Sequence, residues 1–181
     1  MSQFEEKTLS SETIFNGRIV QLVVEDVELP NGAKSKREIV KHPGAVAVIA
    51  QTDDNKVILV RQYRKPLEKE IYEIPAGKLE PGEEPESSAI REMEEETGYT
   101  CGSVQHLVSF YTSPGFSDEL LHVYVATDLV KGKPHLDEDE FLEIEEVELN
   151  EALQMIQDHR IYDAKTVYAI QYLQMIQLSQ K

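Results

Sequence analysis

In the stretch GKLEPGEEPESSAIREMEEETGY, from Gly77 to Tyr99, the part between Glu80 and Glu96 contains eight acidic residues and a single base, Arg91. Like charges that neighbour one another on a helix repel by a few tenths of a kcal/mol per pair. Carboxylates gathered in this way are also the oxygen ligands that hard cations such as Mg²⁺ prefer. The pattern is therefore consistent with a metal site for phosphate chemistry, and also with a solvated acidic surface.

Two residues mark the ends of the helix that would carry these carboxylates. Pro85 suits a first helical turn, because the N–H that proline lacks would be unpaired there in any case. Gly98 suits the position after the last turn, which commonly adopts a left-handed conformation. The sequence therefore predicts a helix over residues 85–97.

The spacing of three glutamates on this helix favours metal binding. Glu92 and Glu96 lie four residues apart, so their carboxylates project from one face, and Glu95 follows Glu92 by three residues. Mg²⁺ is bound through one or two carboxylates and keeps several waters that substrate phosphates can replace. Glu94 is expected to point to water.

The segment matches the pattern G-x5-E-x7-R-E-U-x-E-E-x-G-U, in which U is a bulky apolar residue. The nine matching positions are Gly77, Glu83, Arg91, Glu92, Met93, Glu95, Glu96, Gly98 and Tyr99. This pattern resembles the signature of the Nudix hydrolases, and the one departure is Tyr99, where the family prefers an aliphatic residue. The resemblance implies an α/β/α sandwich with a mixed sheet. It also implies hydrolysis of a nucleoside diphosphate linked to another moiety.

The same resemblance implies roles for individual residues. Divalent metal ions, two or more Mg²⁺ or Mn²⁺, would be bound by Glu92, Glu96 and the carbonyl of Ala76, with Glu95 close by as a catalytic residue. Arg91 would pair with Glu83 and hold the loop against the helix, which a bidentate arginine can do and a lysine cannot. Gly77 and Gly98 would have structural roles in turns.

Pro114 bears on the substrate. It lies sixteen residues after Gly98, in YTSPGFSDE, and a proline at about this distance resembles the ADP-ribose pyrophosphatase subgroup. The segments KREIVKHPGAVAV, RQYRKPLE, EIPAG and LDEDEF also resemble bacterial members of that subgroup. The implied reaction converts ADP-ribose and water to AMP and ribose 5-phosphate.

A second acidic segment, DEDE at 137–140, supplies candidates for the general base. By resemblance, Glu138 would be the base and Glu140 a further metal ligand. Glu119 is the rival base, or a residue that contacts substrate across a dimer. A solvated acidic loop remains the alternative for the residues of the segment.

Few cations are available for an anionic substrate in a chain with a formal net charge of −16. Arg37 and Arg64 match positions that contact substrate in the family, and each offers a bidentate fork to phosphate. An aromatic ring for the adenine could come from Phe15, Tyr63 or Phe116. The other expected substrate-binding residues are Glu38, His42, Lys78, Ser113, Pro114, Gly115 and Glu119.

The elements that must position these residues are readable as short apolar runs and turns. Strands are expected within 12–41, around an Asn31-Gly32 turn, and at 45–50, 56–60, 71–77, 105–112 and 120–129. Two helices are expected near the C-terminus, one capped by Asn150 and one by Asp163. This order predicts an α+β fold. We expect an N-terminal antiparallel hairpin region over 1–42, which would form a dimer, and a Nudix hydrolase domain over 43–181.

Composition limits the class of protein and its partners. The strong negative charge argues against nucleic-acid binding, which needs a basic surface. The single cysteine, Cys101, fits a reducing cytosol, and no apolar segment approaches the roughly 20 residues of a membrane span. We therefore expect a cytoplasmic homodimer that acts on a small nucleoside diphosphate and binds neither nucleic acid nor a membrane.

Three alternatives remain at this point. The same chemistry could act on a nucleotide sugar such as GDP-mannose, or on a diadenosine polyphosphate. The chain could be a nucleotide-binding regulator that has lost catalysis, although such proteins usually lose the glutamates that are present here. An acidic calcium-binding protein is disfavoured because the D-x-[DN]-x-[DN]-G loop does not occur.

Overall fold

The computed structural model describes residues 2–136 and 141–179. The predicted base Glu138 and the predicted metal ligand Glu140 therefore lie outside the described residues. The chain divides into two compact units. Unit 1 comprises Met1–Ala45 and Ser109–Leu121, and unit 2 comprises Val46–Val108 and His122–Lys181.

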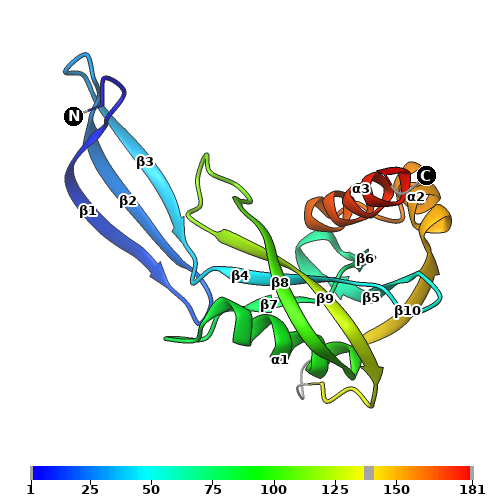
Figure 1. Ribbon diagram of the computed structural model, residues 1–181. Helices are drawn as coiled ribbons and strands as arrows, with labels where there is room; N and C mark the ends of the chain where they lie inside the picture. The colour runs from blue at the N-terminus through cyan, green and yellow to red at the C-terminus, as the bar shows by residue number, and fades with distance from the viewer. Residues whose placement is uncertain (1, 137–140, 180–181) are drawn as a thin grey trace. The chain divides into compact units, whose positions relative to one another are not determined.

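Unit 1 contains a three-stranded antiparallel sheet in the order β1-β2-β3 (Figure 1). The strands are β1 (Lys7–Asn16), β2 (Gln21–Glu28) and β3 (Lys34–Lys41). The expected Asn-Gly turn joins β2 to β3, with Gly32 at a φ of 81° and its N–H bonded to the carbonyl of Leu29 at 2.8 Å. β1 begins at Lys7, five residues before the extended segment that the sequence predicts.

Unit 2 contains two sheets, and their apolar strands form its core. One sheet has the order β10-β5-β6 and the other the order β7-β4-β9-β8. The near-continuous apolar runs of β4 and β5 are buried, as expected for strands covered on both faces. The bounds are β4 (Ala45–Ala50), β5 (Lys56–Arg64), β6 (Lys69–Glu73), β7 (Ala76–Lys78), β8 (Tyr99–Tyr111), β9 (Leu120–Lys131) and β10 (Leu142–Glu148), with a short 3-10 turn, η1 (Lys65–Leu67).

Helix α1 (Pro85–Thr97) has the bounds that the sequence predicts. It ends at Gly98, whose φ is 70° and whose N–H bonds to the carbonyl of Glu94 at 2.8 Å. Ala89 and Met93 are fully buried on its inner face and pack in the core of the unit. Because this face of α1 packs in the core, only glutamates on the other faces of the helix are available for a functional site.

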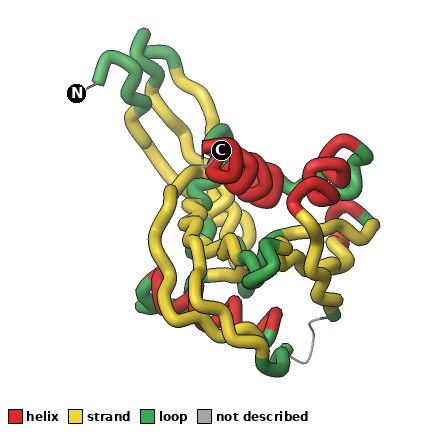
Figure 2. Tube along the Cα trace, turned by 45° about the vertical axis from the view of Figure 1, so that its right-hand side comes forward, coloured by secondary structure: helices red, strands yellow, loops and turns green. Residues whose placement is uncertain are grey.

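The two C-terminal helices, α2 (Leu149–Gln157) and α3 (Ala164–Ser179), lie side by side (Figure 2). α2 begins at Leu149, so the expected cap Asn150 lies inside the helix, and that prediction is wrong. Asp163 does cap α3, because its Oδ2 accepts the N–H of Thr166 at 2.9 Å. In the part of the chain that the structure describes, three helices and antiparallel strand pairing confirm the α+β class. Within the described residues, no helix is both long and apolar enough to cross a membrane.

Candidate metal and diphosphate site

Helix α1 presents two buried carboxylates. Glu92 is 9% and Glu96 is 3% exposed, whereas the side chain of Glu95 is 41% exposed. Burying a carboxylate is costly unless a cation or hydrogen-bond donors compensate for the lost water. The spacing of Glu92 and Glu96 places both carboxylates on the side of α1 that faces β7, and the contacts that compensate for the lost water lie on this side.

Gly77 of β7 lies against the carboxylate of Glu92. A Cβ at this position would lie 1.8 Å from Cδ, 2.0 Å from Oε1 and 2.2 Å from Oε2 of Glu92. No other residue could therefore occupy position 77 without displacing that carboxylate. The sequence suggested a turn as the reason for this glycine, and the structure gives close approach to Glu92 instead.

Ala76, the neighbour of Gly77, contacts the second buried carboxylate. Its N–H donates to Oε2 of Glu96 at 3.0 Å. The backbone of β7 thus touches both Glu92 and Glu96, and it brings the carbonyl of Ala76, the third expected ligand, into the same segment. The two carboxylates and the β7 backbone are referred to below as the carboxylate site.

Arg91 joins the loop before α1 to the helix. Its Nε and Nη2 donate to Oε1 and Oε2 of Glu83, both at 2.9 Å. This bidentate pair lowers the pKa of Glu83 to about 2, chiefly through the hydrogen bond from Arg91, and raises the pKa of Arg91. The geometry is that of a planar fork on a carboxylate, which only arginine provides.

The remaining nitrogen of Arg91 faces the carboxylate site. Nη1 lies 2.9 Å from Oε1 of Glu92 and 2.8 Å from Oε2 of Glu95. One guanidinium therefore compensates for part of the negative charge on three glutamates. The face of α1 that carries Arg91 and Glu95 borders a cavity of ≈ 430 Å³, which is also lined by His135.

The donor set at the carboxylate site suits a hard divalent cation. Within residues 2–136 and 141–179, no three histidine, cysteine, aspartate or glutamate side chains gather closely enough to hold a metal by themselves. Mg²⁺ does not need three, because it is commonly bound by one or two carboxylates together with waters and substrate phosphates. Glu92, Glu96 and the Ala76 carbonyl, all oxygen donors, fit that cation better than a soft one.

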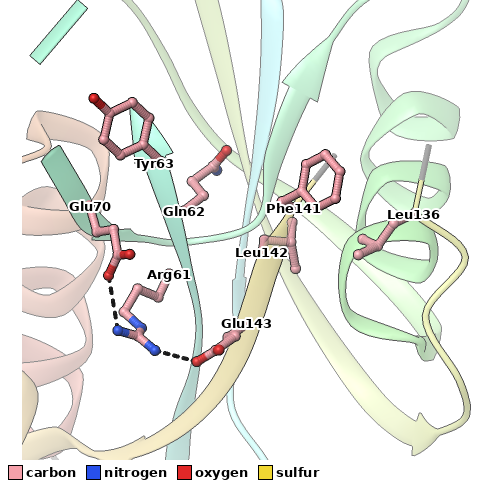
Figure 3. Close-up of a pocket in the computed structure, with 8 residues that line it drawn as sticks. All are labelled: Arg61, Gln62, Tyr63, Glu70, Leu136, Phe141, Leu142 and Glu143. Carbon is pink, nitrogen blue, oxygen red and sulfur yellow. Dashed lines mark hydrogen bonds and ion pairs between the residues drawn. The ribbon is translucent and has the colours of Figure 1, made fainter. Parts of the chain in front are cut away.

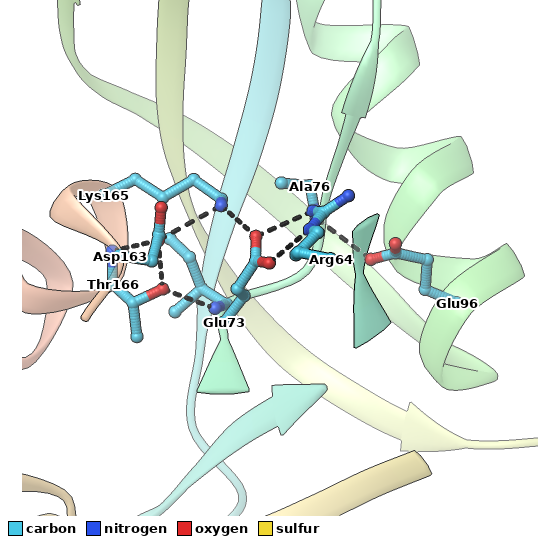
Figure 4. A network of polar contacts seen from close by, with 8 residues as sticks. Arg64, Glu73, Ala76, Glu96, Asp163, Lys165 and Thr166 are labelled. Carbon is cyan, nitrogen blue, oxygen red and sulfur yellow. Dashed lines mark hydrogen bonds and ion pairs between the residues drawn. The ribbon is translucent and has the colours of Figure 1, made fainter. Parts of the chain in front are cut away.

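Arg64, at the end of β5, is held by a glutamate of β6 (Figure 4). Its Nε and Nη2 donate to Oε1 and Oε2 of Glu73 at 2.5 and 2.8 Å. Glu73 is 2% exposed and also accepts a hydrogen bond from Lys165 of α3. Burial alone would raise the pKa of Glu73, but the bonds and charges of Arg64 and Lys165 outweigh it and lower the pKa. Glu73 and Lys165 were not among the residues predicted from the sequence, although an acid within the apolar segment IYEIPA was a usable signal.

A cavity of ≈ 420 Å³ lies beside the end of β5 in unit 2 (Figure 3). Tyr63, one of the candidates for stacking on adenine, lines it and is 54% exposed. Arg61 also lines it and is held by Glu70, at 3.0 Å, and by Glu143. The other residues around this cavity are Gln62, Leu136, Phe141 and Leu142.

Two of the expected substrate-binding residues lie in the sheet of unit 1. Arg37 donates from Nε and Nη2 to the carboxylate of Glu6 at 2.7 and 2.5 Å, and this hydrogen bonding raises the pKa of Arg37. Glu38 pairs with Val24 of β2 in the strand register. Any role of Arg37 toward a phosphate would therefore require exchange of its Glu6 partner.

His42 and the loop 112–119 also belong to unit 1. The N–H of His42 donates to Oδ1 of Asp118 at 2.9 Å, and its Nδ1 accepts the N–H of Gly44 at 3.1 Å. Nδ1 of His42 lies 3.7 Å from Oε1 of Glu119. The imidazole thus has a turn role and lies close to a candidate base.

The loop that carries the diagnostic proline is tied to β3. The carbonyl of Ser113 accepts the N–H groups of Phe116 and Ser117 at 3.1 and 2.9 Å, which forms a turn over Pro114 and Gly115. The carbonyl of Phe116 in turn accepts the N–H of Val40 at 2.8 Å. Lys78, the remaining predicted residue, is exposed at the end of β7 in unit 2.

Within an α+β fold, two buried carboxylates of an acidic helix thus pack against a glycine-containing strand, an arrangement that offers oxygen ligands suited to a divalent cation. The chain belongs to the Nudix hydrolases, since the NUDIX domain matches residues 41–169. The nucleoside diphosphate sugar hydrolase N-terminal domain matches residues 6–40.

Sequence alignments with known proteins cover nearly the whole chain. An ADP-ribose pyrophosphatase of Bacillus subtilis (strain 168) is 60% identical over 97% of this chain and 96% of its own length. A methanol dehydrogenase activator of Bacillus methanolicus is 63% identical over 95% of this chain and 94% of its own. A crystal structure of an ADP compounds hydrolase aligns with a TM-score of 0.84 and 25% identity, over 99% of this chain and 97% of that one.

Proposed function

We propose that this protein hydrolyses the pyrophosphate bond of ADP-ribose, giving AMP and ribose 5-phosphate, with Mg²⁺ or Mn²⁺ as the divalent cation. The observation that carries the proposal is the packing of Glu92 and Glu96 against Gly77 and Ala76. The similarity to the Bacillus subtilis ADP-ribose pyrophosphatase supports the choice of substrate.

The chain's own residues would hold the metal and keep its ligands in place. Glu92, Glu96 and the carbonyl of Ala76 would bind two or more cations, with Glu140 as an additional ligand. When bound, divalent cations lower the pKa of water and neutralise charge on the phosphates. Arg91 keeps the glutamates from repelling one another in the absence of substrate, through its bonds to Glu92 and Glu95.

The reaction adds the oxygen of one water to a phosphorus atom while the bond from that phosphorus to the bridging oxygen breaks. The bridging oxygen leaves with the other phosphate, and the proton of the water passes to a carboxylate base. We propose Glu138 as this base, with Glu119 as the rival, and Glu95 as a further catalytic residue. Such phosphoryl chemistry depends mainly on positioning and on charge neutralisation.

The remaining residues are proposed to recognise the substrate. Arg64 would bind the diphosphate beside the carboxylate site, and Arg37 would bind it after leaving Glu6. The other proposed contacts come from Glu38, His42, Lys78, Ser113, Pro114, Gly115 and Glu119. A homodimer formed through the N-terminal sheet, in the cytoplasm, is the assembly that we propose.

A substrate panel tests the proposal against the nearest chemical alternative. GDP-mannose pyrophosphatases are among the relatives, one of Yersinia enterocolitica at 36% identity over 73% of this chain. We expect kcat/KM for ADP-ribose to exceed that for GDP-mannose and for diadenosine polyphosphates by about tenfold or more, measured by chromatography of the released nucleotides. A higher value for GDP-mannose would contradict the assignment of ADP-ribose.

A further inference from the structure

Four charged side chains from three elements form a compact cluster in unit 2, and the roles proposed above use only one of them. They are Arg64 of β5, Glu73 of β6, Lys165 of α3 and Asp163, which precedes α3 (Figure 4). This set is called the four-charge cluster below. Its formal charges sum to zero, and beyond the α3 cap provided by Asp163 no role has been given above to Glu73, Lys165 or Asp163.

Glu73 is the centre of the four-charge cluster. Its carboxylate, 2% exposed, accepts two hydrogen bonds from Arg64 and one from Lys165, whose side chain is 12% exposed. Lys165 also lies 3.1 Å from Oδ2 of Asp163. A buried carboxylate with three charge-assisted bonds has little freedom to rotate, so the direction in which it holds Arg64 is fixed.

The first turn of α3 fixes the backbone of this region as well. Oδ2 of Asp163 accepts the hydroxyl of Thr166 at 2.6 Å, and that hydroxyl oxygen accepts the N–H of Ile74 at 2.9 Å. Ile74 directly follows Glu73, and two residues later Ala76 donates to Glu96. The end of β6 is therefore held between α3 and the carboxylate site.

Arg64 is held by one edge only. Its Nε and Nη2 bond to Glu73, which leaves Nη1 outside this bidentate pair. The side chain is 40% exposed. Figure 4 shows the guanidinium between Glu73 and the contact of Ala76 with Glu96. The charge of Glu96 adds to the bond from Glu73 in raising the pKa of Arg64.

Lys165 helps to hold Glu73, and through Glu73 it helps to hold Arg64. With Lys165 present, the charge of Glu73 is shared between two cations, and the four-charge cluster is neutral beside Glu96. Without Lys165 the cluster would carry one net negative charge next to a site that already contains two buried carboxylates. The carboxylate of Glu73 would also lose one of its three charge-assisted bonds, so it would be freer to rotate and to carry the guanidinium of Arg64 with it.

We infer that Glu73 and Lys165 are positioning residues that hold one edge of Arg64, so that its other edge faces the diphosphate of the substrate beside the carboxylate site. The identity of the ligand rests on the proposed function, whereas the positioning of Arg64 does not. Buried ion pairs can often be replaced by apolar residues without loss of stability. A purely structural role of Lys165 therefore predicts no change in KM that depends on Arg64, whereas the positioning role predicts such a change.

Steady-state kinetics with a double-mutant cycle separate the two roles. We expect K165M to raise KM about tenfold with kcat within about threefold of wild type, and K165R to restore KM to within about threefold. In an R64Q background, K165M should change KM less than about twofold, because Lys165 acts through Arg64. R160M is the matched control, since Arg160 is an exposed cation paired with Asp158 and Glu151, and it should behave as wild type.

The cycle also defines the results that would overturn the inference. An unchanged KM in K165M would do so, as would an equal increase in KM in the R64Q background. If K165M fails to fold, the E73Q/K165M double variant removes both buried charges together and takes its place in the cycle. It should show the same increase in KM with Arg64 present and the same lack of effect in R64Q.

A measurement without turnover keeps this inference separate from the proposed function. The side-chain Nε–H of Arg64, assigned by its absence in R64K, can be followed by ¹H–¹⁵N NMR. We expect slow hydrogen exchange in the wild type and exchange about tenfold faster or more in E73Q and K165M, with no change in R160M. Unchanged exchange in E73Q and K165M would overturn the positioning role. If ADP-ribose is not hydrolysed but the hydrogen-exchange pattern is as expected, only the assignment of ADP-ribose as the substrate is contradicted. The kinetic cycle would then use the panel substrate with the highest kcat/KM.

Discussion

Substitution of Gly77 by alanine is the change whose effect can be worked out most completely from the structure. The added Cβ would lie 1.8 Å from Cδ of Glu92, whereas ordinary contacts begin near 3.4 Å, so the carboxylate must move by about 1.6 Å. A misplacement of about 1 Å in a catalytic group can cost on the order of 10²-fold in rate. We therefore expect G77A to lower kcat/KM for the pyrophosphate substrate by about 10²-fold or more, and to raise the Mg²⁺ concentration needed for half-maximal rate.

Gly82, in the turn between β7 and α1, provides the matched control. It has a φ of 82°, and among the described residues no atom lies within 4 Å of an added Cβ, so G82A strains the backbone but leaves Glu92 in place. We expect G82A to lose stability with kcat/KM within about threefold of wild type. The assay is initial-rate hydrolysis at varied Mg²⁺, with thermal unfolding measured for both variants.

The proposed cause of the G77A effect can be refuted directly. If the clash with Glu92 is responsible, G77A should lower the stability of the wild type but not that of an E92A variant, in which no carboxylate remains to be displaced. A G77A variant that keeps about a third or more of the wild-type kcat/KM would refute the argument. An equal loss of stability with and without the Glu92 side chain would refute it as well.

Three further changes have defined outcomes. Because the pKa of Glu83 is lowered to about 2 from 4.5, its pair with Arg91 stabilises the fold above pH 4.5 and this contribution is lost as the pH falls from 4.5 to 2. Chemical denaturation should show E83Q less stable by about 1–2 kcal/mol at pH 7, after allowance for solvent screening, with the difference vanishing near pH 2; a difference that does not depend on pH would contradict the ionic origin. D163A should cost about 1 kcal/mol of unfolding free energy through loss of the α3 cap, measured in urea, and a variant as stable as wild type would show that the cap is dispensable. E138Q should lower kcat with little change in Mg²⁺ affinity; normal turnover in E138Q together with an inactive E119Q would move the base to Glu119.

Local signals in the sequence were sufficient for helix α1 and for the β2–β3 turn. Pro85 and Gly98 mark the helix ends because the lack of an N–H and the freedom to adopt positive φ are properties of single residues. The Asn31-Gly32 turn is readable for the same reason. β1 was only partly recognised, since all ten of its residues are exposed and no apolar alternation marks it as a strand.

The four-charge cluster could not be assembled from the sequence, because its members meet only in the folded chain. Glu73 and Lys165 are 92 positions apart, and although Glu73 lies in the EIPAG segment, no motif spacing connects it to Lys165. The close approach of Gly77 to Glu92 was likewise not readable from the sequence, since it depends on a distance that exists only in the folded chain. Spacing along one helix is readable because it is local, whereas contacts between elements depend on how the sheets and α3 pack.

The central claim is that the buried carboxylates Glu92 and Glu96 hold the cation that supports pyrophosphate hydrolysis. Its most direct test is the rate of ADP-ribose hydrolysis as a function of Mg²⁺ for the wild type, E96Q and the control E94Q. The amide oxygen that E96Q introduces can still accept the N–H of Ala76, so the fold should remain intact while one ionic ligand is lost. We predict a fall in kcat of about 10³-fold in E96Q, with thermal unfolding near that of the wild type, and rates within about twofold of wild type for E94Q. Wild-type turnover in a folded E96Q variant would contradict the account.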